Sequence, residues 1–285
     1  MTIRKTSATR PCAPVSARDG ALSVCQHSTG RIGRVVQHVL DTGSTNDIAL
    51  EAGRNGAAEG FVAVAEAQTA GRGRLGRQWH APTGSSLLFS ILFRPPEPLA
   101  YHASRVTMVC GLGLIEAVRK VSGASVWLKW PNDLIVMPTD DARDWHKLAG
   151  MLTEVEPASS EVPAFVVVGI GLNVNVPEGS LAHLGPNATS LLALTGQKID
   201  RAQVLDRLLE AVDRGYTALL SGTDPLPVWR ATLAWLGSTV EVVRSTERLV
   251  GVAAGVDDDG ALLLRSLDGK MLRITAGDVS LRPSS

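Results

Sequence analysis

A segment rich in glycine and arginine contains the residues whose types and spacing most clearly suit chemistry. It reads GRGRLGRQW over residues 71–79. Glycines let a backbone approach an anion closely, and the guanidinium groups of Arg72, Arg74 and Arg77 can bind phosphate oxygens bidentately. Trp79 could add a flat surface for a purine. The segment satisfies GxGxxG, but a dinucleotide-binding fold needs a helix directly afterwards, where a strand is expected here. A solvated basic loop is an equally good interpretation of these residues alone.

A short turn further along the chain combines a cation, an amide and a carboxylate. Residues 129–134 read KWPNDL. Lys129 could hold nucleotide phosphates, and a magnesium ion could lie near Asp133, because Mg²⁺ prefers carboxylate and phosphate oxygens and retains several waters. Asn132 supplies the amide. The commoner interpretation of such a turn is a plain Asn/Asp connection between two strands with an exposed lysine.

Three further motifs carry weaker signals. Lys147 begins the apolar stretch KLAG, where a lysine could reach a buried anion or extend to the surface. Residues 169–175 read GIGLNVN, so two glycines clear space before two amides, although a bulge or turn would look the same. Residues 44–46 are Ser-Thr-Asn, which suit either a ligand site or a helix cap.

Composition excludes several classes of protein. The 28 basic and 28 acidic residues give no net charge, which argues against a dedicated nucleic-acid or membrane-surface protein. No apolar run approaches the roughly 20 residues that a membrane span requires. The three cysteines and six histidines lack metal-ligand spacing, and no GxSxG nucleophile elbow is present. An odd, small number of cysteines favours a reducing cytoplasm over a disulfide-bonded exterior.

The periodicity of the chain predicts the elements that would position these motifs. Helices are expected at about 45–54, 104–121 and 201–220, with a shorter one ending near 236. Strands are expected at 61–67, 86–93, 125–130, 133–137, 147–155 and 163–170, which together suggest a mainly antiparallel sheet. Four short strands at 240–243, 249–254, 261–265 and 271–275 are joined by Asp-Gly turns and suggest a small β-barrel.

The first 34 residues differ from the rest in composition and in apolar patterning. They carry six arginines and lysines against one acid, Asp19, and they show no sustained apolar period. We therefore expect a disordered arm over 1–34, a main domain over 35–236 and a small C-terminal domain over 237–285.

Taken in order, these motifs resemble the biotin protein ligase family. The resemblance rests on 44–46, Gln68 with 71–79, 129–133, 147–150 and 169–173, and it spans roughly 35–281. It implies an α+β fold of the class II synthetase type, a mixed sheet with helices on one side, followed by an SH3-like barrel. It also implies that biotin's carboxylate attacks the α-phosphate of ATP, with magnesium present. A lysine of a biotin carboxyl carrier domain of an acyl-CoA carboxylase would then take biotin from the adenylate.

The resemblance also implies roles for individual residues. Catalysis would involve Arg72, Lys129 and Lys147. Biotin would be bound by Ser44, Thr45, Asn46, Gln68, Gly71, Arg72 and Lys147, with room left by Gly169 and Gly171. The nucleotide would be bound by Arg74, Arg77, Trp79, Lys129, Asn132, Asp133 and Asn173, and Asp133 would be the magnesium ligand.

Alternatives remain at this stage. A lipoate or octanoate protein ligase shares the fold and the adenylation chemistry, although the 71–79 and 129–133 motifs favour biotin. A non-catalytic nucleic-acid-binding module is disfavoured by the neutral charge and by the 4% of aromatic residues. The 34 N-terminal residues are too few and too polar for a helix-turn-helix domain, so no specific DNA binding is expected. Either a monomer or a weak homodimer is compatible with the sequence.

Overall fold

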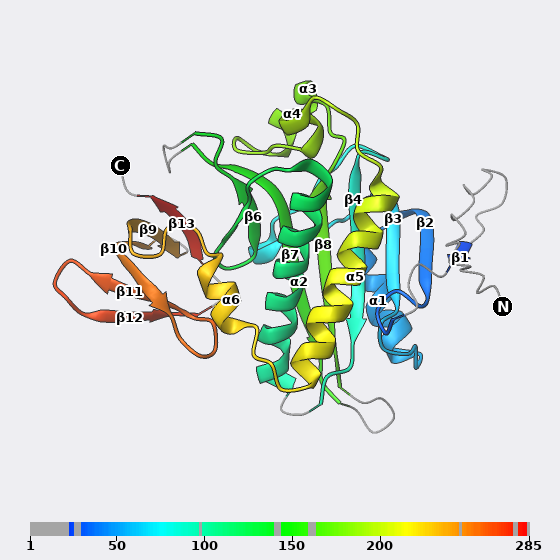
Figure 1. Cartoon of the computed structure of the whole chain (residues 1–285), viewed down its shortest axis with the longest axis horizontal. Coiled ribbons are helices and arrows are strands. Elements are labelled where there is room, and N and C mark those ends of the chain that lie inside the picture. The colour runs from blue at the N-terminus through cyan, green and yellow to red at the C-terminus, as the bar shows by residue number, and fades with distance from the viewer. Residues whose placement is uncertain are drawn as a thin grey trace, which may run out of the picture.

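Two sheets of unequal size organise the chain (Figure 1). The computed structural model describes residues 23–25, 30–96, 99–139, 144–158, 164–244, 247–275 and 279–283. Within these residues, helices pack on a large mixed sheet, and a smaller antiparallel sheet follows at the C-terminal end. The α+β class expected from the sequence is confirmed.

Eight of the described strands form the large sheet, in the order β1-β2-β3-β4-β8-β7-β6-β5. Their bounds are β1 Ser23–Cys25, β2 Val36–Thr42, β3 Val62–Gln68, β4 Ser86–Phe93, β5 Trp127–Lys129, β6 Asp133–Val136, β7 His146–Glu156 and β8 Phe165–Asn173. Among the described pairs β2 and β3 run parallel, and the other neighbours are antiparallel. The mainly antiparallel arrangement agrees with the prediction.

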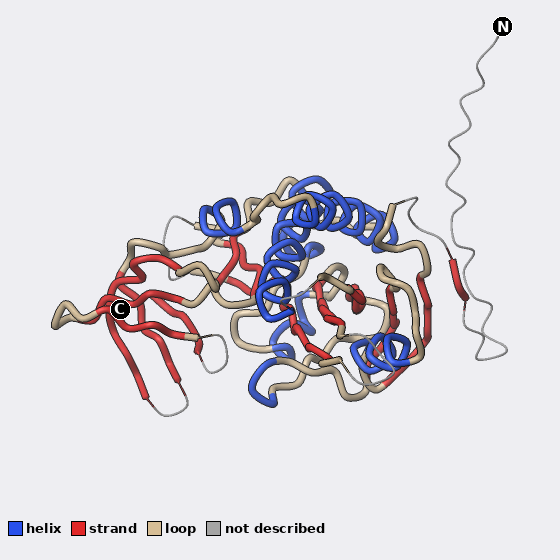
Figure 2. The backbone as a smooth tube through the Cα atoms, turned by 90° about the horizontal axis from the view of Figure 1, so that it is seen from below, coloured by secondary structure: helices blue, strands red, loops and turns tan. Residues whose placement is uncertain are grey.

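The two faces of the large sheet have different neighbours because side chains alternate along a strand. Phe89 and Ile91 of β4 join the main core beneath α2 (Leu99–Ser122) and α5 (Arg201–Leu220). Leu92 instead joins a second core with Ala49 and Leu50 of α1 (Thr45–Arg54). Figure 2 shows helices on both sides of the sheet. The expectation of helices on one side therefore holds for α2 and α5 but not for α1.

The remaining helical elements are short. They are η1 Arg74–Gly76, α3 Glu178–Leu181, η2 Ala182–Leu184, α4 Leu191–Thr195 and α6 Leu226–Ala231. None of the helices in the described part of the chain combines the length and apolarity needed to cross a membrane. Cys110 of α2 is a free thiol within the main core, and burial raises its pKa well above the ordinary value. It is therefore a core residue rather than a reactive one.

The C-terminal sheet has the order β12-β11-β10-β9-β13. Its strands are β9 Thr239–Arg244, β10 Glu247–Val256, β11 Leu262–Ser266, β12 Met271–Ile274 and β13 Val279–Pro283. Gly260 and Gly269 both have φ of +83°, as the predicted Asp-Gly turns require. β13 was not expected. Trp130 Nε1 donates to the Gly260 carbonyl at 2.9 Å, so the turn before β11 is joined to the main domain.

The folded region begins earlier in the chain than the predicted boundary at residue 35. Ile32 is fully buried in the main core, and its backbone N–H donates to Asp213 Oδ1 at 2.8 Å. β1 pairs with the start of β2. A single buried isoleucine among polar residues gives too little periodicity to be detected in the sequence. The rest of the predicted arm, residues 1–22 and 26–29, lies outside the described residues.

The burial of Ile32 leads to a stability prediction. We expect Ile32→Ala to lower the free energy of unfolding by about 2–4 kcal/mol, because it removes a buried side chain and leaves a cavity. Val35→Ala is the matched control, since Val35 is 41% exposed and its truncation should cost less than about 0.5 kcal/mol. Urea unfolding midpoints would measure both. Equal, small effects would mean that the 30–34 segment contributes nothing to the core.

Candidate active site

A pocket of about 380 Å³ opens on the face of the large sheet that carries α1. It brings together segments that are far apart in the sequence, including the 71–79 loop and the 129–133 turn. The sequence-predicted residues that line it are Ser44, Thr45, Asn46, Gln68, Arg72, Arg74, Arg77, Trp79, Lys129, Asn132, Asp133, Lys147, Gly169, Gly171 and Asn173. Gly71 lies just outside, where its carbonyl accepts from the Trp79 N–H at 2.9 Å.

The N-terminus of α1 forms one end of the pocket. Ser44 is the N-cap, and its hydroxyl accepts from the Asn46 backbone N–H at 3.3 Å. The backbone N–H and the hydroxyl of Thr45 donate to Gln68 Oε1 at 2.7 and 3.0 Å. Both interpretations of this motif therefore apply, since the residues cap a helix and also line the pocket.

The Asn46 side chain lines the pocket, and both of its polar atoms are hydrogen-bonded within the protein. Its Oδ1 lies 2.6 Å from the Ser90 hydroxyl, and its Nδ2 lies 2.5 Å from Glu154 Oε2 and 3.4 Å from the Leu152 carbonyl. The side chain approaches the backbone of β8 so closely that a Cβ on Gly169 would lie 2.0 Å from Asn46 Oδ1. Gly169 is thus required for α1 to reach the sheet.

The 71–79 loop has a bonded stem and an exposed tip. The stem includes the bond from the Gly73 N–H to the Arg77 carbonyl at 2.7 Å. The tip is a single 3₁₀ turn in which Leu75 takes a left-handed φ of +61° and is 51% exposed. A non-glycine residue in this conformation is strained by roughly 1 kcal/mol or more. The tip is therefore the part of the loop best able to rearrange.

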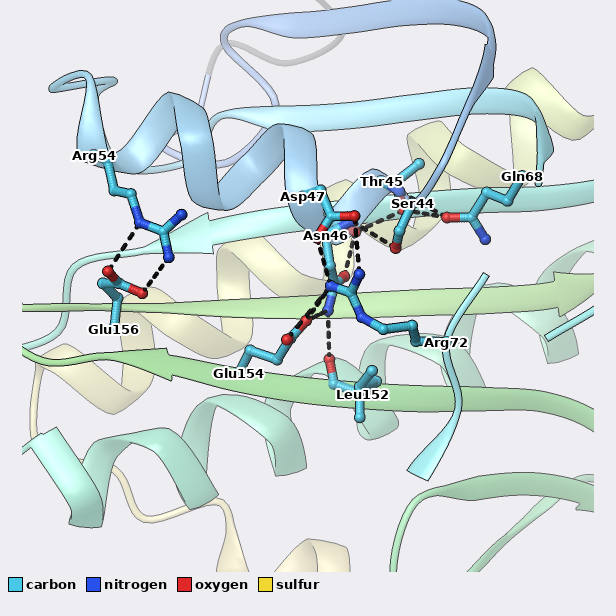
Figure 3. Close-up of polar contacts among 11 residues, drawn as sticks. Ser44, Thr45, Asn46, Asp47, Arg54, Gln68, Arg72, Leu152, Glu154 and Glu156 are labelled. Carbon is cyan, nitrogen blue, oxygen red and sulfur yellow. Dashed lines mark hydrogen bonds and ion pairs between the residues drawn. The ribbon is translucent and has the colours of Figure 1, made fainter. Parts of the chain in front are cut away.

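Arg72 points toward two carboxylates (Figure 3). It makes a bidentate ion pair with Asp47 of α1, at 2.7 and 2.9 Å, and a second ion pair with Glu154 of β7 at 3.1 Å. The hydrogen bond with Asp47 raises the pKa of the Arg72 guanidinium above its ordinary value. The loop stem is consequently tied to both a helix and a strand.

Trp79 lies on the two glycines of the neighbouring strands. A Cβ on Gly171 would lie 2.4 Å from its Cε2 atom, and one on Gly150 would lie 3.1 Å from Cζ3. The Lys147 ammonium lies 5.4 Å from the indole centroid, a cation–π distance. Nε1 of Trp79 is buried without a hydrogen-bond partner in the described part of the chain. The indole thus offers a donor and a flat face at the pocket.

The 129–133 turn is fixed by several contacts. The Trp130–Pro131 peptide is cis, and Asn132 exchanges two hydrogen bonds with the backbone of Met151, at 2.6 and 2.9 Å. Lys129 is 5% exposed, with its ammonium 5.3 Å from the Trp145 centroid. The Asp133 carboxylate pairs with Lys147 at 2.8 Å. The turn thus places one ammonium group and one carboxylate at the pocket, and Lys147 of β7 adds a second ammonium group beside that carboxylate.

Asn173 lines the pocket and is hydrogen-bonded within the protein. Its Nδ2 donates to the Thr189 carbonyl at 3.0 Å, and its Oδ1 lies 3.4 Å from the Ser86 hydroxyl. The side chain is 2% exposed. Its amide therefore holds the segment that follows α3 and η2 against the sheet, and this shapes the pocket.

Several residues of the site were not identified from the sequence. Ser90, Asp47 and Glu154 bind the side chains of the predicted motifs, and Trp145 and 184–188 add to the lining. Asp47 directly follows the Ser-Thr-Asn motif, which was a usable signal. Glu154 lies on the same face of β7 as Gly150, because residues two and four apart along a strand point the same way. Nothing local distinguishes Ser90 within its apolar strand.

Metal-binding capacity at the site is limited. Among the described residues, no group of three or more His, Cys, Asp or Glu side chains could hold a metal ion. Asp133 is the single carboxylate among the residues that line the pocket. This donor set fits a magnesium ion held chiefly by phosphate oxygens and water, which is how Mg²⁺ usually binds beside nucleotides.

Comparison with protein families identifies both parts of the chain. Residues 41–173 match the model of the biotin/lipoate A/B protein ligase family, and residues 235–282 match that of the biotin protein ligase C-terminal domain. The first match contains the motifs that line the pocket, and the second contains most of the C-terminal sheet.

Three known proteins are similar to this chain over most of its length. The biotin–[acetyl-CoA-carboxylase] ligase of Mycobacterium tuberculosis is 35% identical over 253 residues, covering 86% of this chain and 88% of that protein. The bifunctional ligase/repressor BirA of Bacillus subtilis is 32% identical over 241 residues, covering 84% of this chain and 71% of its own. A solved biotin protein ligase from Aquifex aeolicus, in complex with biotin and ATP, has a TM-score of 0.69 with 28% identity, covering 87% and 99% of the two chains.

The contact between Gly169 and Asn46 leads to a prediction about the stability of the protein. We expect Gly169→Ala to lower the free energy of unfolding by about 1–3 kcal/mol, because the new methyl group must displace Asn46 from its buried hydrogen bonds. Gly179→Ala is the control, since no atom lies within 4 Å of the methyl group that it would add. Thermal and urea unfolding would measure both variants. A neutral Gly169→Ala would contradict the tight packing of α1 on β8.

Proposed function

The chain belongs to the biotin protein ligase family, and from this premise we infer that it activates biotin with ATP and transfers it to a protein. The observation that carries the inference is the pocket itself. Motifs from five separate segments, which individually have ordinary structural explanations, converge on one cavity. The match of residues 235–282 to the biotin protein ligase C-terminal domain favours biotin over lipoate or octanoate as the substrate.

The proposed reaction has two steps. A carboxylate oxygen of biotin attacks the α-phosphorus of ATP, the bond to the bridging oxygen breaks, and pyrophosphate leaves. The amine of a carrier-protein lysine then attacks the acyl carbon of biotinyl-5′-adenylate, AMP leaves, and the amine loses a proton. We propose a biotin carboxyl carrier domain of an acyl-CoA carboxylase as the acceptor, as the name of the Mycobacterium tuberculosis relative suggests.

Biotin is proposed to bind at the α1 end of the pocket. Ser44, Thr45 and Gln68 present hydroxyl and amide groups there, which suit a ureido ring and its chain. Gly171 leaves room for a bicyclic ligand beside β8, provided that the Trp79 indole above it moves aside or stacks on the ligand, whereas Asn46 occupies the space at Gly169. Asn46 forms part of the wall, because its amide is already bonded within the protein.

Lys147 is proposed to stabilise the charge that builds up as the carboxylate and the α-phosphate react. Its ammonium lies at the pocket lining, 5.4 Å from the centroid of the Trp79 indole and 2.8 Å from the Asp133 carboxylate. A preorganised cation in a site from which water is excluded favours the transition state over the ground state. Arg72 is less suited to this role, since two carboxylates already bind its guanidinium.

ATP is proposed to bind beyond Lys147, along the loop and the turn. Arg74, Arg77 and Lys129 would contact the triphosphate, and the indole of Trp79 would face the adenine. Asn132 and Asn173 shape this end through their backbone contacts. A magnesium ion, when bound, would neutralise phosphate charge, and Asp133 is the side chain placed to hold it directly or through water.

The sequence also supports proposals about the cellular location of the protein and about DNA binding. We propose a cytoplasmic location because the chain has only three cysteines, an odd number that does not suit a disulfide framework. We also propose that the protein does not bind DNA specifically, because its net charge is zero. Gel-shift titration at low salt would reveal any such binding.

The decisive experiment is exchange of labelled pyrophosphate into ATP by the purified protein with magnesium, with biotin or lipoate in parallel. Biotin-dependent exchange would support the proposed first step, and transfer to a carrier domain would then test the second. Exchange with lipoate alone would retain the chemistry and replace the substrate. No exchange with either acid would overturn the proposal.

Loss of the Lys147 ammonium should affect the chemistry far more than the fold. We expect Lys147→Ala to lower kcat for exchange by about 100- to 1,000-fold, the size found when one stabilising group is removed from a developing charge. The midpoint of unfolding should change little, because the Lys147 side chain is 34% exposed. Lys120→Ala, at an exposed ion pair outside the pocket, serves as the control. Exchange by Lys147→Ala at the rate of Lys120→Ala would contradict the assignment.

The loop is expected to retain the adenylate. A mixed anhydride hydrolyses readily, so a loop that closes over it would exclude water until the acceptor arrives. We expect Arg74→Gly to form biotinyl-5′-adenylate but to release it at least tenfold faster, measured by rapid filtration. Leu75→Gly controls for added backbone flexibility, since it introduces glycine at the neighbouring left-handed position without removing a charge. Tight retention by Arg74→Gly would contradict this role.

A further inference from the structure

One carboxylate connects the loop with the wall of the pocket. Glu154 Oε2 accepts from Asn46 Nδ2 at 2.5 Å and from Arg72 Nη2 at 3.1 Å, so both groups share a single oxygen atom (Figure 3). Asn46 begins α1, Glu154 lies on β7, and Arg72 belongs to the loop stem. The loop stem is therefore joined, through this one carboxylate, to the amide that packs on Gly169.

A second carboxylate holds the same arginine from the other side. Asp47, in the first turn of α1, binds both terminal nitrogens of Arg72. Two carboxylates face one guanidinium, so the group carries a formal charge of −1. An anionic ligand gains little from such a cluster, because the positive charge is already neutralised and the excess charge repels it. The cluster suits an anchor for the loop better than a contact for biotin's carboxylate.

We propose that Glu154 and Asp47 are positioning residues for biotin binding, which fix Arg72 and thereby the loop stem and Asn46. The proposal rests on the proposed function and assigns Arg72 to the anchor rather than to the reacting carboxylate. Its distinctive consequence is that Arg72, Glu154 and Asp47 act as one unit. Loss of any one member should loosen the same end of the pocket, so the single variants should weaken biotin binding alike.

The chain contains a closely matched control. Arg54, at the end of α1, pairs with Glu156 two residues further along β7, through two contacts of 2.9 Å. The Arg54–Glu156 pair joins α1 to β7, and the Arg72–Glu154 pair joins the loop stem to the same face of β7. Both pairs are partly exposed. Within the described part of the chain, Glu156 bonds Arg54 and does not bond Asn46 or the 71–79 loop. A variant at Glu156 therefore reports the general effect of losing a carboxylate from β7.

The test is a double-mutant cycle measured by biotin titration calorimetry without ATP and by pyrophosphate exchange. We expect Glu154→Gln and Arg72→Gln each to weaken biotin binding about tenfold, the effect of losing a hydrogen bond to a charged group. The double variant should also be weakened about tenfold, whereas independent effects would multiply to about 100-fold. Because Arg72 is not assigned to the reacting groups, kcat at saturating biotin and ATP should stay within about twofold, and Glu156→Gln should bind biotin like the wild type.

Asp47→Asn provides a second route to the same conclusion if a change at Glu154 impairs folding. It lies on α1 and should weaken biotin binding in the same direction as Glu154→Gln, with kcat at saturating substrates unchanged. A merely structural effect would lower the unfolding midpoint and kcat together.

Three outcomes would overturn the proposal. Unchanged or tighter biotin binding by Glu154→Gln and Asp47→Asn would mean that these acids only compete with the ligand for Arg72. A fall in kcat specific to Arg72→Gln would place Arg72 at the reacting carboxylate. An equal effect of Glu156→Gln would make the loss a general property of β7. A wild-type protein that binds no biotin would instead overturn the proposed function, so the two failures are distinguishable.

Discussion

The N-terminus of α1 lies directly on the sheet because Gly169 has no side chain, and much of the pocket follows from this contact. Asn46 fills the space that a Cβ would occupy, and its amide bonds Ser90, Leu152 and Glu154. The helix is thereby placed so that Thr45 reaches Gln68 and Asp47 reaches Arg72. A methyl group at one position of β8 would displace this whole end of the site.

Stability and chemistry are divided between the two faces of the large sheet. Alternate residues of β4 and β8 face α2 and α5 and build the main core, whereas the opposite positions carry Ser90, Gly169 and Gly171. Small and polar residues on the second face cost little, because the first face already buries a large apolar surface. The expectation that all helices lie on one side missed this division, since α1 covers part of the face that holds the pocket.

Local patterns predicted most of the site, and their limits are physical. Glycine spacing, arginine clusters and short polar turns depend on neighbours in sequence, and the residues that they indicated line the pocket. Glu154 was missed because its partner Arg72 lies 82 residues away, so no window shows the pair. The link from Trp130 to Gly260 spans 130 residues. The burial of Ile32 was missed because a single apolar residue in a polar stretch gives no repeating apolar pattern.

The two walls of the pocket are held with different strengths, which suits a site that must open and close. Hydrogen bonds fix the 129–133 turn, including those of Asn132 to Met151 and of Trp130 to Gly260, in the turn before β11. The loop stem is held to α1 and β7 by the partly exposed ion pairs of Arg72, and solvent weakens such pairs. Local opening therefore costs least at the loop. The bond from Trp130 to Gly260 ties the 129–133 turn, and with it Lys129 and Asp133, to the C-terminal sheet.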